Sequence, residues 1–168
     1  MVLLPPRFIL ALATLGPVGR RLKAPGTWGS VAGLVWYTVF FHPWGEVGLV
    51  FWAVLTSLLA VPICAQAEVI LRRRDPGEVI LDEMVAVPFC FLGIMPLLAA
   101  GDDARYWLVG LLAFALFRLF DILKPFGIAK LQRAPGGWGV VVDDVAAALA
   151  TCLCLHALIH LFPRLFFG

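Results

Sequence analysis

The chain alternates between long apolar segments and short polar connections. Apolar side chains dominate residues 28–41, 47–66, 84–100, 106–123 and 140–162. Because a membrane-spanning helix needs about 20 apolar residues, within a range of about 17–25, the pattern predicts about five apolar helices. The first is short and is therefore expected to be tilted or only partly inserted. Residues 8–15 are too few to span a bilayer, and we expect them to form a re-entrant or interfacial N-terminal segment.

Composition narrows the class of protein. The 168 residues are 62% hydrophobic and only 14% charged, whereas soluble domains are nearer half apolar and a quarter charged. The short alternating segments of a membrane β-barrel are absent. The expected fold is therefore all-α, a compact multi-span membrane helical bundle that forms one domain over residues 1–168. The net charge of +2 gives no reason to expect a nucleic-acid partner.

The basic residues predict which ends of the helices face the cytoplasm. Loops rich in Lys and Arg stay on the cytoplasmic side. The loops 41–46 and 100–105 together contain a single basic residue, Arg105. The connections at the opposite ends contain three basic clusters: Arg20, Arg21 and Lys23; Arg72, Arg73 and Arg74; and Lys124, Lys130 and Arg133.

Four polar motifs lie at this same predicted cytoplasmic side. They are LKAPGTWGS (22–30), DPGEVILDE (75–83), RLFDILKP (118–125) and the pair Asp143 and Asp144. Each motif alone fits charges that merely favour a helix dipole. Together they bring more carboxylates than cations to one membrane face. Ionisable groups at such depth pair with one another or mark a functional site.

The residue types predict a metal and a phosphate. Oxygen ligands suit Mg²⁺, which also takes phosphate oxygens of a substrate, and basic side chains bind phosphate directly. Thr27, in a glycine-rich stretch, can cap a helix whose N-terminus attracts anions. The expected Mg²⁺ ligands are Asp82, Glu83, Asp121, Asp143 and Asp144, and the expected phosphate ligands are Lys23, Thr27, Arg118 and Lys124. A phospholipid or polyprenyl phosphate at headgroup depth is the predicted substrate.

The adjacent pair Asp143 and Asp144 cannot act identically, because successive helical residues point about 100° apart. We expect one of them to bind Mg²⁺. The other would orient the attacking water, a basic side chain or a second ion. If Asp144 faces the third segment with Asp82, then Asp143 should turn toward Arg118 or Lys124, and the reverse assignment is equally open.

The motifs KAPGTWGS, DPGEVILDE, FRLFDILKPFGI and GGWGVVVDD, in this order, resemble those of the phosphatidylglycerophosphatase A family. The resemblance covers nearly the whole chain, from about residue 8 to the fifth segment. It implies a Mg²⁺-dependent, all-helical phosphatase of the bacterial inner membrane with its active site on the cytoplasmic side. Such an enzyme converts phosphatidylglycerophosphate to phosphatidylglycerol among the membrane lipids. One departure is Ala86, where the family commonly has glycine.

The resemblance carries over residue by residue. The matching positions are Lys23, Thr27, Ser30, Asp75, Asp82, Glu83, Arg118, Asp121, Lys124, Pro125, Gly137, Gly139, Asp143 and Asp144. The nucleophile is either a water activated by the metal or a carboxylate that forms an aspartyl-phosphate, with Asp82, Asp143 and Asp144 as the catalytic candidates. The alternative function is a small ion-coupled transporter, which predicts charges near the midplane and symmetric repeats. The chain has neither feature.

Overall fold

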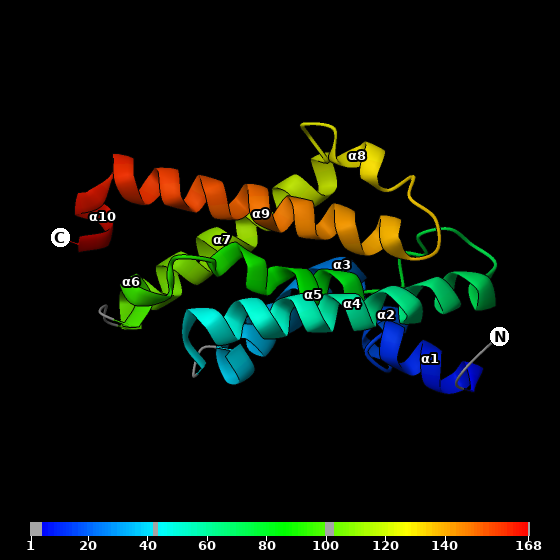
Figure 1. The fold of residues 1–168 in the computed structure, drawn as a ribbon. Coiled ribbons are helices and arrows are strands. Elements are labelled where there is room, and N and C mark those ends of the chain that lie inside the picture. Colours follow the sequence, from blue (N-terminus) through cyan, green and yellow to red (C-terminus); the bar gives the residue numbers. More distant parts are fainter. Residues whose placement is uncertain (1–4, 42–43, 100–102, 168) are drawn as a thin grey trace.

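The computed structural model describes residues 5–41, 44–99 and 103–167, and these residues contain helices and connections without a strand (Figure 1). The all-α prediction is confirmed. Three helices are long and apolar enough to cross a membrane: α4 (Gly45–Leu71), α7 (Asp103–Leu123) and α9 (Trp138–Leu161). They correspond to the predicted segments 47–66, 106–123 and 140–162, so the structure is that of a helical membrane protein.

The predicted third span, residues 84–100, is wrong as a single helix. It is divided into α5 (Leu81–Ala86), the 3₁₀-helix η3 (Val87–Phe91) and α6 (Met95–Ala99). Pro88 lacks an amide hydrogen, and Gly93 has a left-handed backbone conformation with a φ of +72°, which favours glycine. The exposed backbone at the break is satisfied by side chains, since the Gly93 N–H donates to Glu46 Oε1 at 2.6 Å. His156 Nε2 lies 2.8 Å from the Leu92 carbonyl oxygen.

The first apolar segment is short, as predicted. The helix α3 (Pro25–Trp36) continues into the π-helix η1 (Tyr37–Phe41), giving 12 and 5 residues. Before it stand the short helices α1 (Pro6–Ala13) and α2 (Val18–Arg21). In α1, Ile9 and Ala13 are buried while Arg7 and Phe8 are exposed, so one face of this helix packs against the bundle. Its location in the membrane interface stays a prediction.

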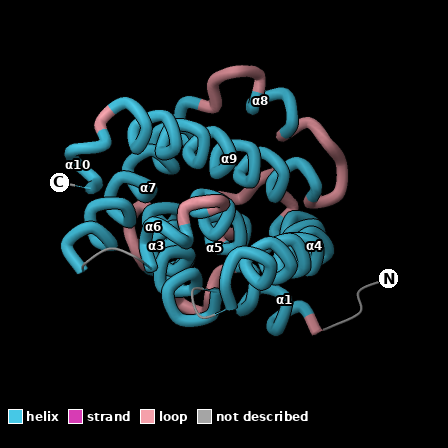
Figure 2. The backbone as a smooth tube through the Cα atoms, turned by 60° about the vertical axis from the view of Figure 1, so that its left-hand side comes forward, coloured by secondary structure: helices cyan, strands magenta, loops and turns pink. Residues whose placement is uncertain are grey.

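The short helix α5 lies at the centre of the bundle (Figure 2), packed against α3, α4 and α9. Its close approach to α3 depends on glycine. A Cβ at Gly33 would lie 2.7 Å from the Val87 Cβ, and one at Gly29 would lie 3.0 Å from the Ile80 Cβ. Ala86, the position that departs from the family pattern, is fully buried. The packing therefore places the N-terminal turn of α3 beside the acidic residues of α5.

The connections that contain the basic clusters meet at one end of the bundle. The Arg74 guanidinium donates to the Gln132 carbonyl oxygen at 2.7 Å, which joins the connection after α4 to the one that contains α8 (Ile128–Leu131). In α2, a Cβ at Gly19 would collide with the Glu78 carbonyl oxygen. The remaining helix, α10 (Pro163–Phe167), follows α9 at the other end (Figure 1).

Candidate active site

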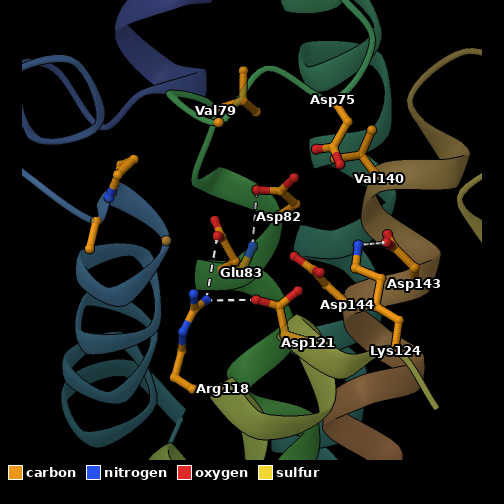
Figure 3. A pocket seen from close by; sticks show the side chains of 14 residues that line it. Asp75, Val79, Asp82, Glu83, Arg118, Asp121, Lys124, Val140, Asp143 and Asp144 are labelled. Atoms are coloured by element: carbon orange, nitrogen blue, oxygen red, sulfur yellow. Dashed lines mark hydrogen bonds and ion pairs between the residues drawn. The ribbon is translucent and has the colours of Figure 1, made fainter. Parts of the chain in front are cut away.

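A cavity of 340 Å³ opens at this basic end, between α3, α5, α7 and α9 (Figure 3). Its lining is polar and mostly acidic. The carboxylates are Asp75, Asp82, Glu83, Asp121, Asp143 and Asp144, and the cations are Arg118 and Lys124. All five carboxylates predicted as metal ligands therefore lie in one cavity, together with two of the four predicted phosphate ligands.

Three of the carboxylates form a tight group. One oxygen each from Asp82, Glu83 and Asp144 lies within 4.8 Å of the other two. Asp82 and Asp144 are 3% and 4% exposed. The Glu83 Oε2 atom is buried and accepts no hydrogen bond from the residues that the structure describes. Carboxylates held this close repel one another unless they share a proton or a cation.

Arg118 connects three elements. Its Nη1 atom donates to Asp121 Oδ2 at 2.7 Å, one turn further along α7. The same atom lies 3.7 Å from Glu83 Oε1 on α5 and 3.4 Å from Ser30 Oγ on α3. A Cβ at Gly26 would collide with Glu83 Oε1 and lie 3.0 Å from Arg118 Nη1. Glycine at this position therefore permits the guanidinium to reach Glu83.

The side chains of Asp143 and Asp144 point in different directions, as expected for neighbours on a helix. Asp144 faces α5 and the Asp82–Glu83 pair, whereas Asp143 Oδ2 accepts an ion-paired hydrogen bond from Lys124 Nζ (Figure 3). The other oxygen, Asp143 Oδ1, is buried and has no hydrogen-bond partner among the described residues. The two carboxylates thus face different parts of one cavity.

Three residues that line the cavity have left-handed backbone conformations. Ala24, Asp75 and Lys124 have φ of 53°, 46° and 44°. Such a conformation costs on the order of 1–3 kcal/mol for a non-glycine residue, and residues that adopt it are often found at functional sites. In Lys124 it reverses the chain directly after α7 ends, just before Pro125. That reversal points the ammonium back toward Asp143 on α9.

The charges of the cavity do not balance. Six carboxylates face two cations, and Arg118 and Lys124 are each already paired with a carboxylate. Burial raises the pKa of Asp82 well above its usual range, and the charge of Glu83 raises it further. Burial, followed by the charges of Asp144 and Asp121, likewise raises the pKa of Glu83. Burial lowers the pKa of Lys124, but the hydrogen bond and charge of Asp143 outweigh this effect and raise it overall.

Some expected site residues lie elsewhere. Lys23 is exposed and Thr27 is half-buried, and neither lines the cavity, although Ala24, Pro25 and Gly26 between them do. Thr27 does not cap α3 with its side chain, because the helix begins at Pro25 and Ala24 occupies the cap position. Their role in binding phosphate stays a prediction.

The connection before α5 also differs from expectation. Asp75 lines the cavity and pairs with the Gln132 side chain, yet the expected metal ligands did not include it. The family motif DPGEVILDE was the signal that pointed to it. Glu78 lies in this connection, before α5 begins at Leu81. It pairs with Arg73 at 2.6 Å.

The fold and the cavity together define an all-helical membrane protein with a buried acidic site at one end of its bundle. The chain belongs to the phosphatidylglycerophosphatase A family, whose profile matches residues 11–159. It is therefore a phosphatase that acts on lipids, and the resemblance seen in the four sequence motifs is confirmed. The transporter alternative is not supported by this membership.

Three relatives are similar over most of the chain. Phosphatidylglycerophosphatase A of Haemophilus influenzae is 35% identical over 80% of this chain and 78% of its own. A putative phosphatidylinositol-3-phosphatase of Bacteroides thetaiotaomicron is 37% identical over 75% and 77%. Phosphatidylglycerophosphatase A of Escherichia coli is 30% identical over 83% and 76%. No solved structure shows significant similarity to the chain.

Proposed function

We propose that this lipid phosphatase hydrolyses the terminal phosphate monoester of phosphatidylglycerophosphate and that it requires Mg²⁺. The observation that carries the proposal is the carboxylate group Asp82, Glu83 and Asp144, whose oxygens lie within 4.8 Å of one another while the nearby cations are already paired. The product, phosphatidylglycerol, is a membrane lipid and a precursor in cardiolipin synthesis.

The donor set fits Mg²⁺. Hard divalent cations prefer carboxylate oxygens, and Mg²⁺ keeps several waters or phosphate oxygens in its coordination shell. Asp82, Glu83 and Asp144 would hold the ion, and the unpartnered Glu83 Oε2 is an oxygen available for it. When bound, the ion supplies Lewis acidity that neutralises charge on the phosphoryl oxygens.

The remaining charged groups suit the phosphate and its attacking group. Arg118 and Lys124 border the same cavity as the carboxylate group and would stabilise the negative charge that develops on the phosphoryl group. Asp143 Oδ2 is paired with the Lys124 ammonium, whereas Oδ1 has no hydrogen-bond partner among the described residues. Oδ1 would therefore accept the proton of an attacking water. Direct attack by a carboxylate remains the second route, and trapping of an aspartyl-phosphate would distinguish the two.

The proposed location is the bacterial cytoplasmic membrane, with several spans and the cavity facing the cytoplasm. The support is the basic residues around the cavity end. Arg72, Arg73 and Arg74 follow α4, and Lys130 and Arg133 precede α9, all of them exposed. By the positive-inside rule these connections lie on the cytoplasmic side. A cysteine-accessibility experiment on residues 73 and 133 in intact cells tests this orientation.

A phosphoinositide is the second candidate substrate, because a relative with 37% identity is named a putative phosphatidylinositol-3-phosphatase. Both lipids present a phosphate monoester on a headgroup, which the acidic cavity and its cations can bind. The test compares phosphate release by the purified chain from phosphatidylglycerophosphate and from phosphatidylinositol 3-phosphate, with Mg²⁺ and with a chelator. We expect Mg²⁺-dependent release from phosphatidylglycerophosphate. Release that persists with the chelator, or that occurs with the phosphoinositide alone, would overturn the proposal.

A further inference from the structure

The helices α3 and α7 run antiparallel and touch at regular intervals, starting from the acidic cavity. Gly26 of α3 lies against Arg118, and Ser30 Oγ lies 3.4 Å from Arg118 Nη1. At the far end, the hydroxyl groups of Thr38 and Tyr106 are 2.8 Å apart. Gly26 and Ser30 of α3 are four residues apart, which is the spacing of one helical face, and Thr38 lies in η1, the continuation of α3. The seam therefore leads from the catalytic cavity toward the opposite side of the membrane.

Toward the far end, where Thr38 and Tyr106 are part of the lining, the seam widens into a mostly apolar groove. It has a volume of 70 Å³, and its lining includes Leu34, Phe91, Leu98, Trp107, Gly110 and Leu111. Trp107 and Leu111 form an open rim, being 66% and 65% exposed. In a membrane protein this rim contacts the hydrocarbon of the bilayer.

Gly110 is not explained by the packing of the protein. A Cβ at this position would meet nothing within 4 Å, in contrast to Gly26, Gly29 and Gly33 of α3, which are required by close neighbours. Glycine weakens the interior of a helix relative to alanine. The space that Gly110 leaves open adjoins the groove, so the backbone of α7 is accessible from the groove at this point.

We propose that the groove holds one acyl chain of the lipid whose phosphate lies in the acidic cavity. The inference rests on the proposed function. Eight residues separate Arg118 from Gly110, which at 1.5 Å per residue is about 12 Å along α7. One leaflet of hydrocarbon is about 15 Å thick. A lipid with its headgroup at Arg118 would thus have the distal half of a chain beside Gly110.

A second apolar cavity fits this role less well. It has a volume of 390 Å³ and lies between α1, α3, α4 and α5. Its lining from α5 is Leu81, Met84 and Val85, whereas Asp82 and Glu83 of the same helix line the acidic cavity. The body of α5 therefore separates this second cavity from the phosphate site, and neither α7 nor α9, the helices of Arg118 and Asp144, contributes to its lining.

The test is a groove-filling substitution, Gly110→Leu, assayed with dipalmitoyl and dihexanoyl phosphatidylglycerophosphate. The control is Ala115→Leu, which introduces the same leucine side chain at an exposed position of α7 outside the groove. We expect Gly110→Leu to lower kcat/KM about tenfold for the dipalmitoyl lipid, since a displaced chain misplaces the phosphate. Turnover of the dihexanoyl lipid, which is too short to reach the groove, should be unchanged and also reports correct folding. The control variant should behave as the unmodified chain with both lipids.

Equal loss with both lipids, or no loss with either, would overturn the inference. A measurement independent of turnover uses dipalmitoyl phosphatidylglycerophosphate with a diazirine in the distal half of a chain, crosslinked in the presence of a chelator. We expect adducts on α7 near Trp107 and Leu111 that Gly110→Leu abolishes, and adducts on α4 at the second cavity would refute the assignment. If the unmodified chain releases phosphate from neither lipid, the proposed function fails, and the crosslinks still decide whether the groove binds an acyl chain.

Discussion

Replacing Asp144 by asparagine should abolish catalysis and at the same time stabilise the metal-free protein. The substitution keeps the size of the side chain and removes one charge from a group of three carboxylates within 4.8 Å. Two unit charges about 4 Å apart interact by about 4 kcal/mol at an effective dielectric constant of about 20. Protons shared among the carboxylates relieve part of this repulsion. We therefore expect a gain of about 2 kcal/mol in the unfolding free energy without Mg²⁺, or roughly 4–8 °C in Tm.

The same charge attracts a bound cation, so its loss should weaken Mg²⁺ binding by at least about a hundredfold, or ~3 kcal/mol. The assay is thermal unfolding of the detergent-solubilised protein at increasing Mg²⁺, beside phosphate release. The unmodified chain should gain stability as Mg²⁺ rises, whereas Asp144→Asn should start higher and stay constant. Asp103→Asn, at an exposed site in the first turn of α7, is the matched control. Full activity of Asp144→Asn, or a Tm that falls below the unmodified value without Mg²⁺, would refute the reasoning.

Three further predictions concern the same cavity. Gly26→Ala should lower kcat by about tenfold to a hundredfold, because the added Cβ displaces the Arg118 guanidinium and the Glu83 carboxylate. The control is Gly77→Ala, which should change kcat much less, because Gly77 lines the cavity with open space around it. Lys124→Gln should lower kcat at least about tenfold, since Asp143 loses its ion-pair partner and the phosphate loses a cation. Because burial raises the pKa of Asp82, its contribution to stability is present at acid pH and lost as pH rises through the folded-state value. Unfolding of the Mg²⁺-free protein should accordingly become easier from about pH 4 toward neutrality, while Mg²⁺ affinity measured by calorimetry should rise over the same range.

For each of these three predictions, a specific result would contradict the reasoning. Equal loss of activity in the two glycine variants would mean that any added methyl group obstructs the substrate. Unchanged kcat in Lys124→Gln would reduce its ion pair with Asp143 to a structural contact. A Mg²⁺ affinity that is independent of pH would place the ion away from the buried carboxylates of α5.

The sequence alone determined the class of fold and the set of candidate ligands. Inside a bilayer each backbone polar group must be satisfied within its own segment, so a long apolar segment predicts a helix. Three of the five predicted segments became the long helices α4, α7 and α9. The asymmetric distribution of Lys and Arg also placed the polar motifs at one end, where the structure brings the five expected carboxylates into a single cavity.

The tertiary structure decided which of these residues act together. Pro88 and Gly93 break the third segment in a way that hydropathy does not record, since both residues are tolerated in apolar helices when neighbouring side chains satisfy the backbone. The spacing of charged residues along the sequence also does not show which of them form ion pairs. Lys124 lies one turn from Asp121 in sequence but pairs with Asp143, which is 19 residues away.

The close approach of helices produced the rest of the site. Gly26 is a common residue at the start of a helix, and only the packing of α3 on α5 and α7 shows that a side chain there would collide with Glu83. Lys23 and Thr27 belong to the same motif, yet the direction of the first turn of α3 leaves both outside the cavity lining. Sequence order fixes which residue types are available, but distances between side chains on different helices depend on how those helices pack, and these distances decide which carboxylates share a cation and which pair with a base.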